Sequence, residues 1–450
     1  MDTELAYSNA LDYLYGFVDY SLKHTSELVK ADFNLDRMVD LMGMLGNPER
    51  KYPILHVAGT KGKGSTSAFM ASALKQAGYT TGLYTSPHLQ DFCERIQVNG
   101  EPVPHADLAD LVDEIKPAVA KIPFITTFEL TTALAFLYFA KKGVNAAVIE
   151  VGMGGRLDAT NIVLPVVSVI TSLSLDHTAV LGNTLALIAG EKAGIIKAGV
   201  PVVSSPQKEE ALQVLEEIAE KRSADLTLVG RDWMFAERSA SLAGQDLEVW
   251  QNGRERVGLH IQMLGAHQVQ NAATAYVGLQ VATQAGLNLT DADIQKGFAQ
   301  TFWPARFEIV RREPPVILDS AHNQDSAIKL HKTLDEYFPG RKVILIFGAS
   351  EDKDVAGMFA EWKPCLSLII TTRADHPRAL DPQQLADLSR KAGIPSEVVP
   401  SVEAALNRAL IISAITGDII LSAGSMFVTA EVRTAWQKIN QQIDHKTTGD

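Results

Sequence analysis

The stretch from Ile54 to Thr66 constrains the fold more than any other part of the sequence. The apolar run 54–58 predicts a buried strand, and it leads directly into a loop of glycine and lysine residues. The segment after the loop is rich in alanine and free of proline, which predicts a helix that ends near Gly78. Strand, glycine loop and helix form an anion site, because backbone N–H groups and the helix dipole converge at one point. The stretch therefore predicts a phosphate-binding loop.

The loop reads Gly59-Thr60-Lys61-Gly62-Lys63-Gly64-Ser65. Its glycines let the backbone approach phosphate oxygens, Lys63 can reach the outer phosphates, and Ser65 or Thr66 can contact phosphate or a metal. The strict P-loop pattern is not met, because Val57 stands at its first glycine and Gly64 follows the lysine. The alternative interpretation of the loop alone is a glycine turn with two solvated lysines.

Composition limits the classes of protein that remain. A chain of 450 residues is too long for one ordinary core, so two or three domains are expected. The net charge of −12 argues against a broad nucleic-acid surface, so a polyanionic ligand needs a local basic pocket. Two cysteines give no disulfide framework, and the start of the chain has no signal-peptide pattern. We expect a cytoplasmic protein that packs Cys93 and Cys365 in its interior.

Strand and helix patterns alternate along the chain, which predicts an α/β fold with a mostly parallel sheet and helices on both faces. Helices are expected within residues 1–50, and residues 225–262 predict an antiparallel flap. Further helices at 268–284 and 291–300 close the first domain, and the tail after Gln441 is expected to be disordered. The expected strands are 54–58, 80–85, 146–151, 166–171 and 200–203, then 316–319, 343–347, 368–372 and 419–422 in a second, smaller α/β domain.

Four polar side chains fall at the carboxyl ends of predicted strands, where open α/β sheets bind ligands. Lys63, Ser86, Glu150 and His177 follow or end four successive strands. Each residue alone is weak evidence, because a strand-end Glu is usually solvated and such a His is usually structural. Together they predict a Mg²⁺ site beside the phosphate loop. Histidine is an unusual Mg²⁺ ligand, so the role of His177 stays open on this reasoning.

Ten segments of the chain, in this order, resemble the folylpolyglutamate synthases and dihydrofolate synthases of the Mur ligase family. The resemblance runs from about residue 30 to residue 435, and the combination of segments is specific where no single one is. The segments are His56 to Thr66, Thr85 to His88, Glu94 to Ile96, Val148 to Asn161, Ser174 to Thr178, Leu181 to Thr184, Glu191 to Ile195, Gly265 to Ala272, Trp303 to Glu308 and Asp319 to Asn323.

The resemblance implies a role for each matching residue. It implies a P-loop-containing, Mur-ligase-like ATPase domain at 1–303, which binds ATP and folate. It also implies a smaller Rossmann-like domain at 304–450, which closes on ATP and binds glutamate. Catalytic roles fall on Lys63, Glu150, His177 and Lys192. The implied ATP-binding residues are Gly59, Thr60, Lys61, Gly62, Lys63, Gly64, Ser65, Asn271, Arg306, Asp319, His322 and Asn323. The implied Mg²⁺ ligands are Ser86, Glu150 and His177; the folate-side residues are Thr127, Phe128, Asp158 and Ala159; and Lys192 is the implied carbamylated lysine.

The chemistry implied is ATP-dependent ligation of L-glutamate to the carboxylate of a folate, and of dihydropteroate, through an acyl phosphate. Transfer of the γ-phosphoryl group needs positioning and charge neutralisation more than a covalent nucleophile. The sequence departs from the family at Ala305 and Ser320, where glycine is usual, and at Gln324, where proline is usual. These departures concern the fine positioning of ATP.

Two other functions are compatible with the loop. One is a Mur-type amide ligase with a non-folate acceptor, against which Phe128 and Asp158 argue. The other is a nucleotide-binding switch protein without ligase activity, although no Asn-Lys-x-Asp base-reading motif is present. We expect small-molecule substrates, a monomer, and neither nucleic acid nor a membrane as partner. The sequence leaves open the folate species, the length of the glutamate chain and the oligomeric state.

Overall fold

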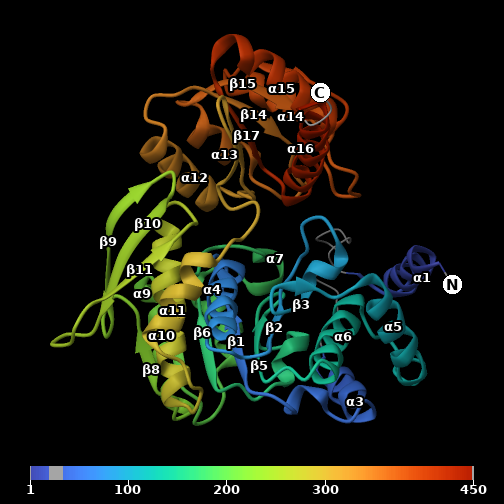
Figure 1. Cartoon of the computed structure of the whole chain (residues 1–450), viewed down its shortest axis with the longest axis vertical. Helices are drawn as coiled ribbons and strands as arrows, with labels where there is room; N and C mark the ends of the chain where they lie inside the picture. Colours follow the sequence, from blue (N-terminus) through green and yellow to red (C-terminus); the bar gives the residue numbers. More distant parts are fainter. Residues whose placement is uncertain (1, 20–33, 448–450) are drawn as a thin grey trace. The chain divides into compact units, whose positions relative to one another are not determined.

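The computed structural model describes residues 2–19 and 34–447, and these residues fall into two compact units. The first unit contains Met1–Gln262 and His267–Phe302, and the second contains Met263–Ala266 and Trp303–Asp450. Each unit has its own sheet, as the colours in Figure 1 make clear. Part of the helical segment expected within residues 1–50 lies outside the described residues.

The first unit is built on an eight-stranded sheet with the order β4-β3-β2-β5-β1-β6-β7-β8. All neighbours pair in parallel except β2 with β3 and β3 with β4, so the expectation of a mostly parallel sheet is confirmed. The strands are β1 (Ile54–Ala58), β2 (Thr81–Tyr84), β3 (Ile96–Val98), β4 (Glu101–Pro102), β5 (Ala146–Glu150), β6 (Val167–Ile170), β7 (Val202–Ser204) and β8 (Leu226–Leu228).

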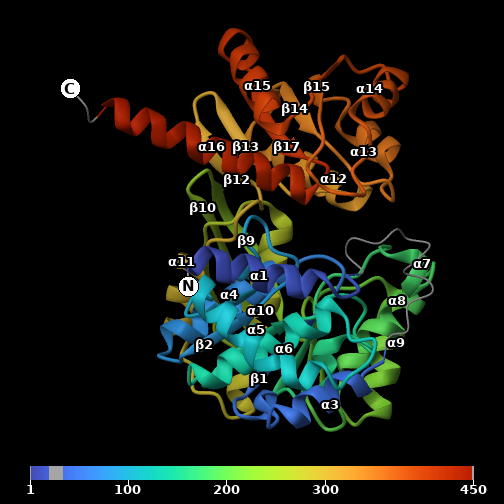
Figure 2. The same ribbon diagram turned by 90° about the vertical axis from the view of Figure 1, so that its right-hand side faces the viewer.

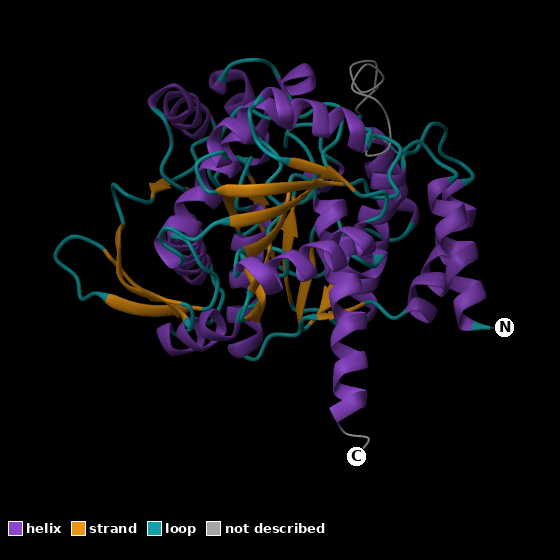
Figure 3. Cartoon of the chain, turned by 90° about the horizontal axis from the view of Figure 1, so that it is seen from above, coloured by secondary structure: helices purple, strands orange, loops and turns teal. Residues whose placement is uncertain are grey.

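Helices cover both faces of this sheet. Two hydrophobic clusters lie on one face, of which one joins the sheet to α1, α3, α5 and α6 and the other joins it to α8 and α9. On the opposite face α10 packs against β6, where an added Cβ at Gly278 would lie 3.2 Å from Val169 Cγ2. Figure 2 shows α5 and α6 beside α1, and Figure 3 distinguishes the helices in purple from the strands in orange. The helices are α1 (Thr3–Tyr15), α3 (Asp36–Met44), α4 (Lys63–Gln76), α5 (His105–Val119), α6 (Thr127–Lys141), α7 (Thr178–Leu181), α8 (Leu185–Lys192), α9 (Glu209–Lys221), α10 (Ala266–Gln284) and α11 (Asp291–Gln300), with 3₁₀ helices η1 (Pro48–Arg50), η2 (Phe92–Arg95), η3 (Ala159–Ile162) and η4 (Ala193–Ile195).

Several of these helix ends follow from the sequence. Thr126 and Glu129 form the capping box that their spacing predicts, with Thr126 Oγ1 accepting from the Glu129 N–H at 3.2 Å. The Asn99-Gly100 turn has positive φ at both residues, +55° and +81°, and joins β3 to β4 as a tight hairpin.

The helix after the phosphate loop, α4, packs closely against α11. Ser72 Oγ donates to Gly297 O at 2.7 Å, and the rings of Phe69 and Phe298 lie 4.8 Å apart. Gly297 has no side chain at the crossing, where an added Cβ would lie 2.5 Å from the Cα of Ala73. The small residue therefore sets the distance between the two helices, and with it the position of α4.

The flap predicted at 225–262 is confirmed in part. A three-stranded antiparallel sheet forms from β9 (Met234–Ser241), β10 (Gly244–Trp250) and β11 (Val257–Ile261). Figure 1 shows these strands standing apart from the main sheet. The start of the segment was assigned wrongly, because β8 pairs in parallel with β7 and completes the main sheet. Three residues of β-forming type are too few for their pattern to distinguish a flap strand from a sheet edge.

The second unit contains a six-stranded sheet in the order β12-β13-β17-β14-β15-β16, parallel except for the β12–β13 pair. The sequence predicted four of these strands and missed β12 and β16 at the edges. The strands are β12 (Glu308–Arg312), β13 (Pro315–Leu318), β14 (Val343–Phe347), β15 (Leu366–Thr371), β16 (Ser396–Val398) and β17 (Ile419–Ala423). The helices are α12 (Gln324–Tyr337), α13 (Val355–Trp362), α14 (Pro382–Lys391), α15 (Val402–Thr416) and α16 (Met426–Thr447).

Helix α16 corrects a second expectation, because it continues past Gln441 to Thr447 where we expected a disordered tail. No helix among residues 2–19 and 34–447 combines the length and the apolar character that a membrane crossing requires.

Replacing Gly297 by Ala should destabilise the first unit. The new Cβ would overlap the backbone of α4, which cannot rotate away as a side chain can, and overpacking of this kind costs about 1–3 kcal/mol. The measurement is the urea midpoint of unfolding, with Gly43→Ala in α3 as the control. An added Cβ at Gly43 has no neighbour within 4 Å, so that variant should be stabilised, by up to about 1 kcal/mol. Equal midpoints for the two variants would contradict the assignment of close packing at Gly297.

Candidate functional site

The sheet of the first unit places the predicted strand-end residues next to one another. Strands β2, β5, β1 and β6 are neighbours, and all four run in parallel. Their carboxyl ends therefore meet at one edge of the sheet, which is where such folds bind ligands. Val57 pairs with Glu150, so the last residue of β5 lies beside the start of the phosphate loop.

The glycine loop depends on close approach between backbone segments. Gly59 has φ of +153°, and an added Cβ would lie 1.8 Å from Thr171 Oγ1. Gly62 has φ of +88°, and an added Cβ would lie 2.2 Å from Asn271 Oδ1. Both positions therefore require glycine. The second contact also shows that Asn271 of α10 lies directly against the loop, as the prediction for this residue requires.

The backbone amides of the loop divide into two groups. The N–H groups of Thr60 and Lys61 both donate to Ser172 O at 3.0 Å, so they hold the loop to the end of β6. The turn from Gly62 to Ser65 begins α4, and the first N–H groups of a helix have no partner within the helix. The anion-binding part of the loop is thus the first turn of α4, where the helix dipole adds its effect.

Lys63 and Glu150 meet at the strand ends. Lys63 Nζ lies 3.8 Å from Glu150 Oε1, and both side chains are largely buried. The backbone N–H of Ser86 donates to Glu150 Oε2 at 3.4 Å, which brings the loop after β2 to the same carboxylate. The hydroxyl of Thr66 is buried without a hydrogen-bond partner in the described structure. The structure therefore brings Lys63, Ser86 and Glu150 together, as predicted.

A small pocket connects Lys63 with His177 and Lys192. His177 adopts a left-handed conformation with φ of +48°, caps α7, and lines this pocket. Lys192 is the last residue of α8 and is only 4% exposed, and its ammonium donates to Gly59 O at 2.8 Å. Burial, with a smaller effect of Lys63, lowers the pKa of Lys192 to about 7. The ammonium of Lys192 can therefore lose its proton near pH 7 and become a neutral amine.

Asp176 and the loop that begins at Gly152 belong to the site but were missed as functional residues. Asp176 Oδ2 accepts from Lys61 Nζ at 2.8 Å and lines the pocket with Gly152, Met153 and Gly154. The signal for Asp176 was its place beside His177 in a strand-end turn. The loop lies within the segment Val148 to Asn161 that carries the family resemblance, but no single one of its glycines was given a role, because glycines that only line a pocket look like glycines of any turn.

The four folate-side residues have internal partners. Thr127 Oγ1 donates to Leu14 O at 2.9 Å. Asp158 is buried, and its carboxylate accepts from the Met153 N–H at 2.9 Å and from the Thr160 N–H at 3.0 Å. Ala159 is buried beside it. Phe128 is half-buried and packs against Gly152, where an added Cβ would lie 2.4 Å from its ring. Asp158 therefore shapes the pocket loop, and a folate contact stays a prediction for all four.

The predicted ATP-binding residues of the second unit form a group of their own. Asp319 is half-buried, and its carboxylate accepts from the N–H groups of Phe307 and Ala321. Its removal from solvent raises its pKa, while the Arg306 charge opposes the shift. Asn323 caps α12, and His322 Nδ1 lies 2.8 Å from Ser320 O. These contacts order the turn from Ala305 and the start of α12.

Two of the family departures have a structural reading. Ala305 adopts φ of +55°, a left-handed conformation that explains why glycine is usual there and that is strained for alanine. Gln324 is the first residue of α12, a position that proline also favours, so the exchange leaves the helix start intact.

Taken together, the site joins an anion-binding helix terminus, three lysines and two carboxylates around one small pocket. Such a set of residues can hold a polyphosphate and stabilise the negative charge on the phosphate oxygens. It can also bind a hard cation through Glu150. The cysteines add no nucleophile, because burial raises the pKa of Cys93 to about 12 and that of Cys365 to about 11.

Two family models match the chain. The Mur ligase middle domain matches residues 57–278, and the Mur ligase glutamate ligase domain matches residues 305–426. The first match contains the phosphate loop and the pocket, and the second contains the Arg306 and Asp319 group.

Known proteins are similar over nearly the whole chain. The dihydrofolate synthase/folylpolyglutamate synthase of Bacillus subtilis is 35% identical over 440 residues, which cover 95% of this chain and 98% of that protein. A Mycobacterium tuberculosis folylpolyglutamate synthase complexed with ADP matches with a TM-score of 0.88 and 32% identity, covering 96% of this chain and 98% of the other. The FolC protein of Escherichia coli in complex with DHPP and ADP matches with a TM-score of 0.85 and 30% identity, with coverage of 96% and 98%.

Replacing Gly62 by Ala should abolish binding of a non-hydrolysable ATP analogue, because the new Cβ would displace Asn271 and distort the first turn of α4. Gly78→Ala is the matched control. Gly78 has the same φ of +88° beyond the other end of α4, and an added Cβ there has no neighbour within 4 Å. The left-handed backbone should cost both variants about 1–2 kcal/mol of stability, and Gly62→Ala should lose more because of its clash with Asn271, but only Gly62→Ala should lose the nucleotide in a calorimetric titration. Normal binding by Gly62→Ala would remove the loop from the site.

Proposed function

Because this chain belongs to the Mur ligase family, in the branch of folylpolyglutamate and dihydrofolate synthases, we propose that the pocket around Lys63 is where it activates a folate carboxylate. The protein is an ATP-dependent ligase that adds glutamate to folates. The observation that carries the site assignment is the meeting of Lys63, Glu150 and the first turn of α4 at one sheet edge.

The reaction has two steps. An oxygen of the folate carboxylate attacks the γ-phosphorus of ATP, the bond to the bridging oxygen breaks, and an acyl phosphate and ADP form. The glutamate amine then attacks the acyl carbon, phosphate leaves, and the amine gives up a proton. The protein contributes position and charge: the amides of the first turn of α4 hold phosphate oxygens, and Lys63 offsets their negative charge. Water must be excluded, because the acyl phosphate hydrolyses.

We further propose that Ser86, Glu150 and His177 hold Mg²⁺. The donor set fits a hard cation, because Glu150 supplies a buried carboxylate, Ser86 supplies a hydroxyl on the adjacent loop, and His177 lines the same pocket as Lys63. Bound Mg²⁺ would neutralise charge on the phosphates of ATP. Histidine is an unusual ligand for Mg²⁺, so the assignment of His177 is supported by its position in the pocket.

The acceptor is the finer part of the proposal. We propose that dihydropteroate is used as well as reduced folates, and the support is that a similar protein was solved with DHPP and that the Bacillus subtilis relative carries both activities in its name. We also propose that residues 1–303 are the ATP- and folate-binding domain and residues 304–450 the glutamate-binding domain. The match of residues 305–426 to a glutamate ligase domain supports the second assignment. A cytoplasmic location is proposed from the two free, buried cysteines.

The test of the function is release of ADP that depends on glutamate, measured with tetrahydrofolate or dihydropteroate as acceptor. The wild type should release ADP with either acceptor, and Lys63→Ala should lose at least about 100-fold in rate, the order expected when one group that stabilises developing charge is removed. Lys75→Ala, an exposed lysine at the other end of α4, is the control and should react normally. ADP release that does not require glutamate would contradict ligation. If tetrahydrofolate supports glutamate-dependent release and dihydropteroate does not, polyglutamylation is the activity that remains.

We propose that Lys192 is N-carbamylated. The Lys192 amine is buried, has a pKa lowered to about 7, and lies in the pocket with Lys63 and Asp176. Its neutral form can attack CO₂: the N–C bond forms and one proton leaves the nitrogen, which turns a cation into a carbamate anion. This change from ammonium to carbamate would remove the charge repulsion between Lys192 and Lys63. The carbamate oxygens could also contact a cation or the substrate.

With ¹³C-labelled bicarbonate, the wild type should give a carbamate signal in the ¹³C NMR spectrum that Lys192→Ala lacks. The control is Lys197→Ala, because Lys197 also has a lowered pKa, about 8, but does not line the pocket. Lys192→Ala should lose most activity, and added short carboxylic acids should restore part of it. The proposal is overturned if the wild type gives no carbamate signal or if the signal survives in Lys192→Ala.

A further inference from the structure

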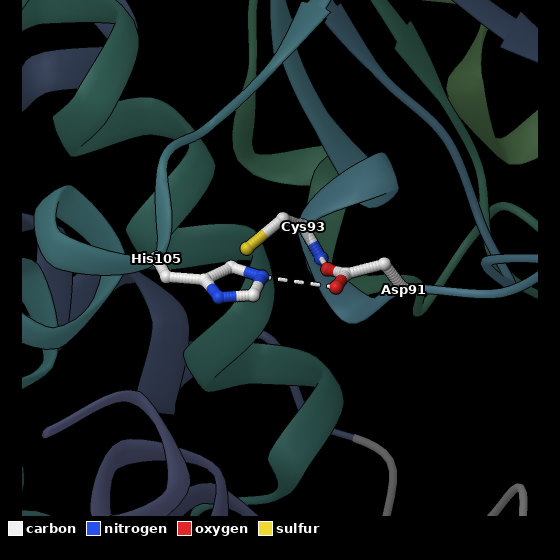
Figure 4. A group of neighbouring side chains, drawn as sticks. All are labelled: Asp91, Cys93 and His105. Atoms are coloured by element: carbon white, nitrogen blue, oxygen red, sulfur yellow. Dashed lines mark hydrogen bonds and ion pairs between the residues drawn. The ribbon is translucent and has the colours of Figure 1, made fainter. Parts of the chain in front are cut away.

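Three potential metal ligands of different chemistry converge in the first unit, outside the pocket around Lys63. Asp91 caps the 3₁₀ helix η2, Cys93 lies within that helix, and His105 is the first residue of α5. One ligand atom from each residue lies within 4.8 Å of the other two. Figure 4 shows the imidazole of His105 facing the carboxylate of Asp91, with the sulfur of Cys93 directed toward the same space. We refer to these residues as the Asp91–Cys93–His105 cluster.

The imidazole of His105 is held between two carboxylates. Its Nε2 lies 3.0 Å from Asp91 Oδ2, and its Nδ1 lies 3.1 Å from Glu4 Oε1. The ring also stacks on Tyr7, with centroids 3.7 Å apart and planes within 5°. The orientation of the ring is thus fixed from three sides, with Nε2 directed at the cluster.

This arrangement matches the surroundings of metal-binding histidines, which usually donate their second ring N–H to a carboxylate. Asp91 is suited to share its carboxylate. Its Oδ1 accepts from the Cys93 N–H at 2.7 Å and from the Tyr7 hydroxyl at 3.1 Å, while Oδ2 faces His105. The side chains of His105 and Asp91 are 31% and 42% exposed, which leaves a path for an ion and room for a water ligand.

We propose that the Asp91–Cys93–His105 cluster binds a divalent transition-metal ion, with Zn²⁺ as the best fit to one carboxylate, one thiolate and one imidazole. Glu4 is then the group that orients His105. The ion takes the place of the proton between His105 and Asp91 and of the thiol proton of Cys93, and both protons go to solvent. Mg²⁺ binds mainly through oxygen and does not favour thiolate, so the thiolate of Cys93 is what distinguishes this site from the one at Glu150.

A metal at this position would join three segments. Glu4 and Tyr7 belong to α1, Cys93 to η2 and His105 to α5. In the same short helix, the guanidinium of Arg95 donates to His88 Nδ1 at 2.9 Å. His88 lies in the loop that follows β2 and contains Ser86. The proposed site is therefore structural, and it would steady the loop that reaches Glu150.

The test is a titration of the chelator-treated full chain with Co²⁺, followed by absorption. A cobalt–thiolate bond gives a charge-transfer band in the near ultraviolet that an oxygen and nitrogen site such as Ser86, Glu150 and His177 does not give. The wild type should show this band, and Zn²⁺ should remove it by displacement. Cys93→Ser should lose the band, and Cys365→Ser, which changes the other buried free cysteine, should keep it.

Two further variants test the geometry if Cys93→Ser does not fold. His105→Gln changes a partly exposed side chain and should remove tight binding. Glu4→Gln should weaken binding by about 10–100-fold, as expected for loss of an orienting carboxylate. The proposal is overturned if the wild type shows no thiolate band with Co²⁺, if the band survives Cys93→Ser, or if a folded His105→Gln binds as tightly as the wild type.

Discussion

The site rests on the close approach of backbone segments at Gly59 and Gly62. With no Cβ at Gly59, the loop lies against Thr171, and the Thr60 and Lys61 amides bind the carbonyl of Ser172. With no Cβ at Gly62, Asn271 of α10 reaches the turn from which α4 begins. Strands β1 and β6 and helices α4 and α10 are thereby fixed around one point. The carbonyl of Gly59 also receives Lys192, so the same backbone positions the buried amine.

The pocket gathers positive charge, whereas the protein as a whole carries negative charge. The chain carries a net charge of −12, yet Lys61, Lys63 and Lys192 gather at one sheet edge. Glu150 and Asp176 pair with two of them, which limits the repulsion and keeps each ammonium in place. In a partly buried site such charges act more strongly than in water. A polyanion is therefore attracted by a few fixed groups, while the acidic surface opposes unspecific binding of nucleic acid.

Short sequence patterns predicted those structural features that depend on residues close together in the chain. The strand, glycine loop and helix at 54–76, the capping box at Thr126 and the hairpin at Asn99-Gly100 each depend on a few adjacent residues, so their sequence patterns indicate them directly. The gathering of Lys63, Ser86 and Glu150 was also predictable, because parallel strands end at one edge. Three features could not be predicted from such local patterns: the partners of Asp176, the closeness of Asn271 to Gly62, and the membership of β8 in the main sheet. These features depend on which segments become neighbours in space, and hydrophobic periodicity does not report that. The Asp91–Cys93–His105 cluster was missed for the same reason, since its orienting residue Glu4 lies on another helix.

The contact between α4 and α11 has a consequence for the order of events during synthesis. Ser72 and Gly297 are 225 residues apart in the chain, yet they are hydrogen-bonded in the finished unit. At a translation rate of roughly 5–20 residues per second, α11 leaves the ribosome on the order of 10–45 s after α4. For that interval the apolar face of α4, with Phe69, has no partner helix. The phosphate loop is thus made early while its supporting packing is completed late, and in that interval the nascent chain exposes apolar surface of the kind that makes unfinished chains prone to aggregate.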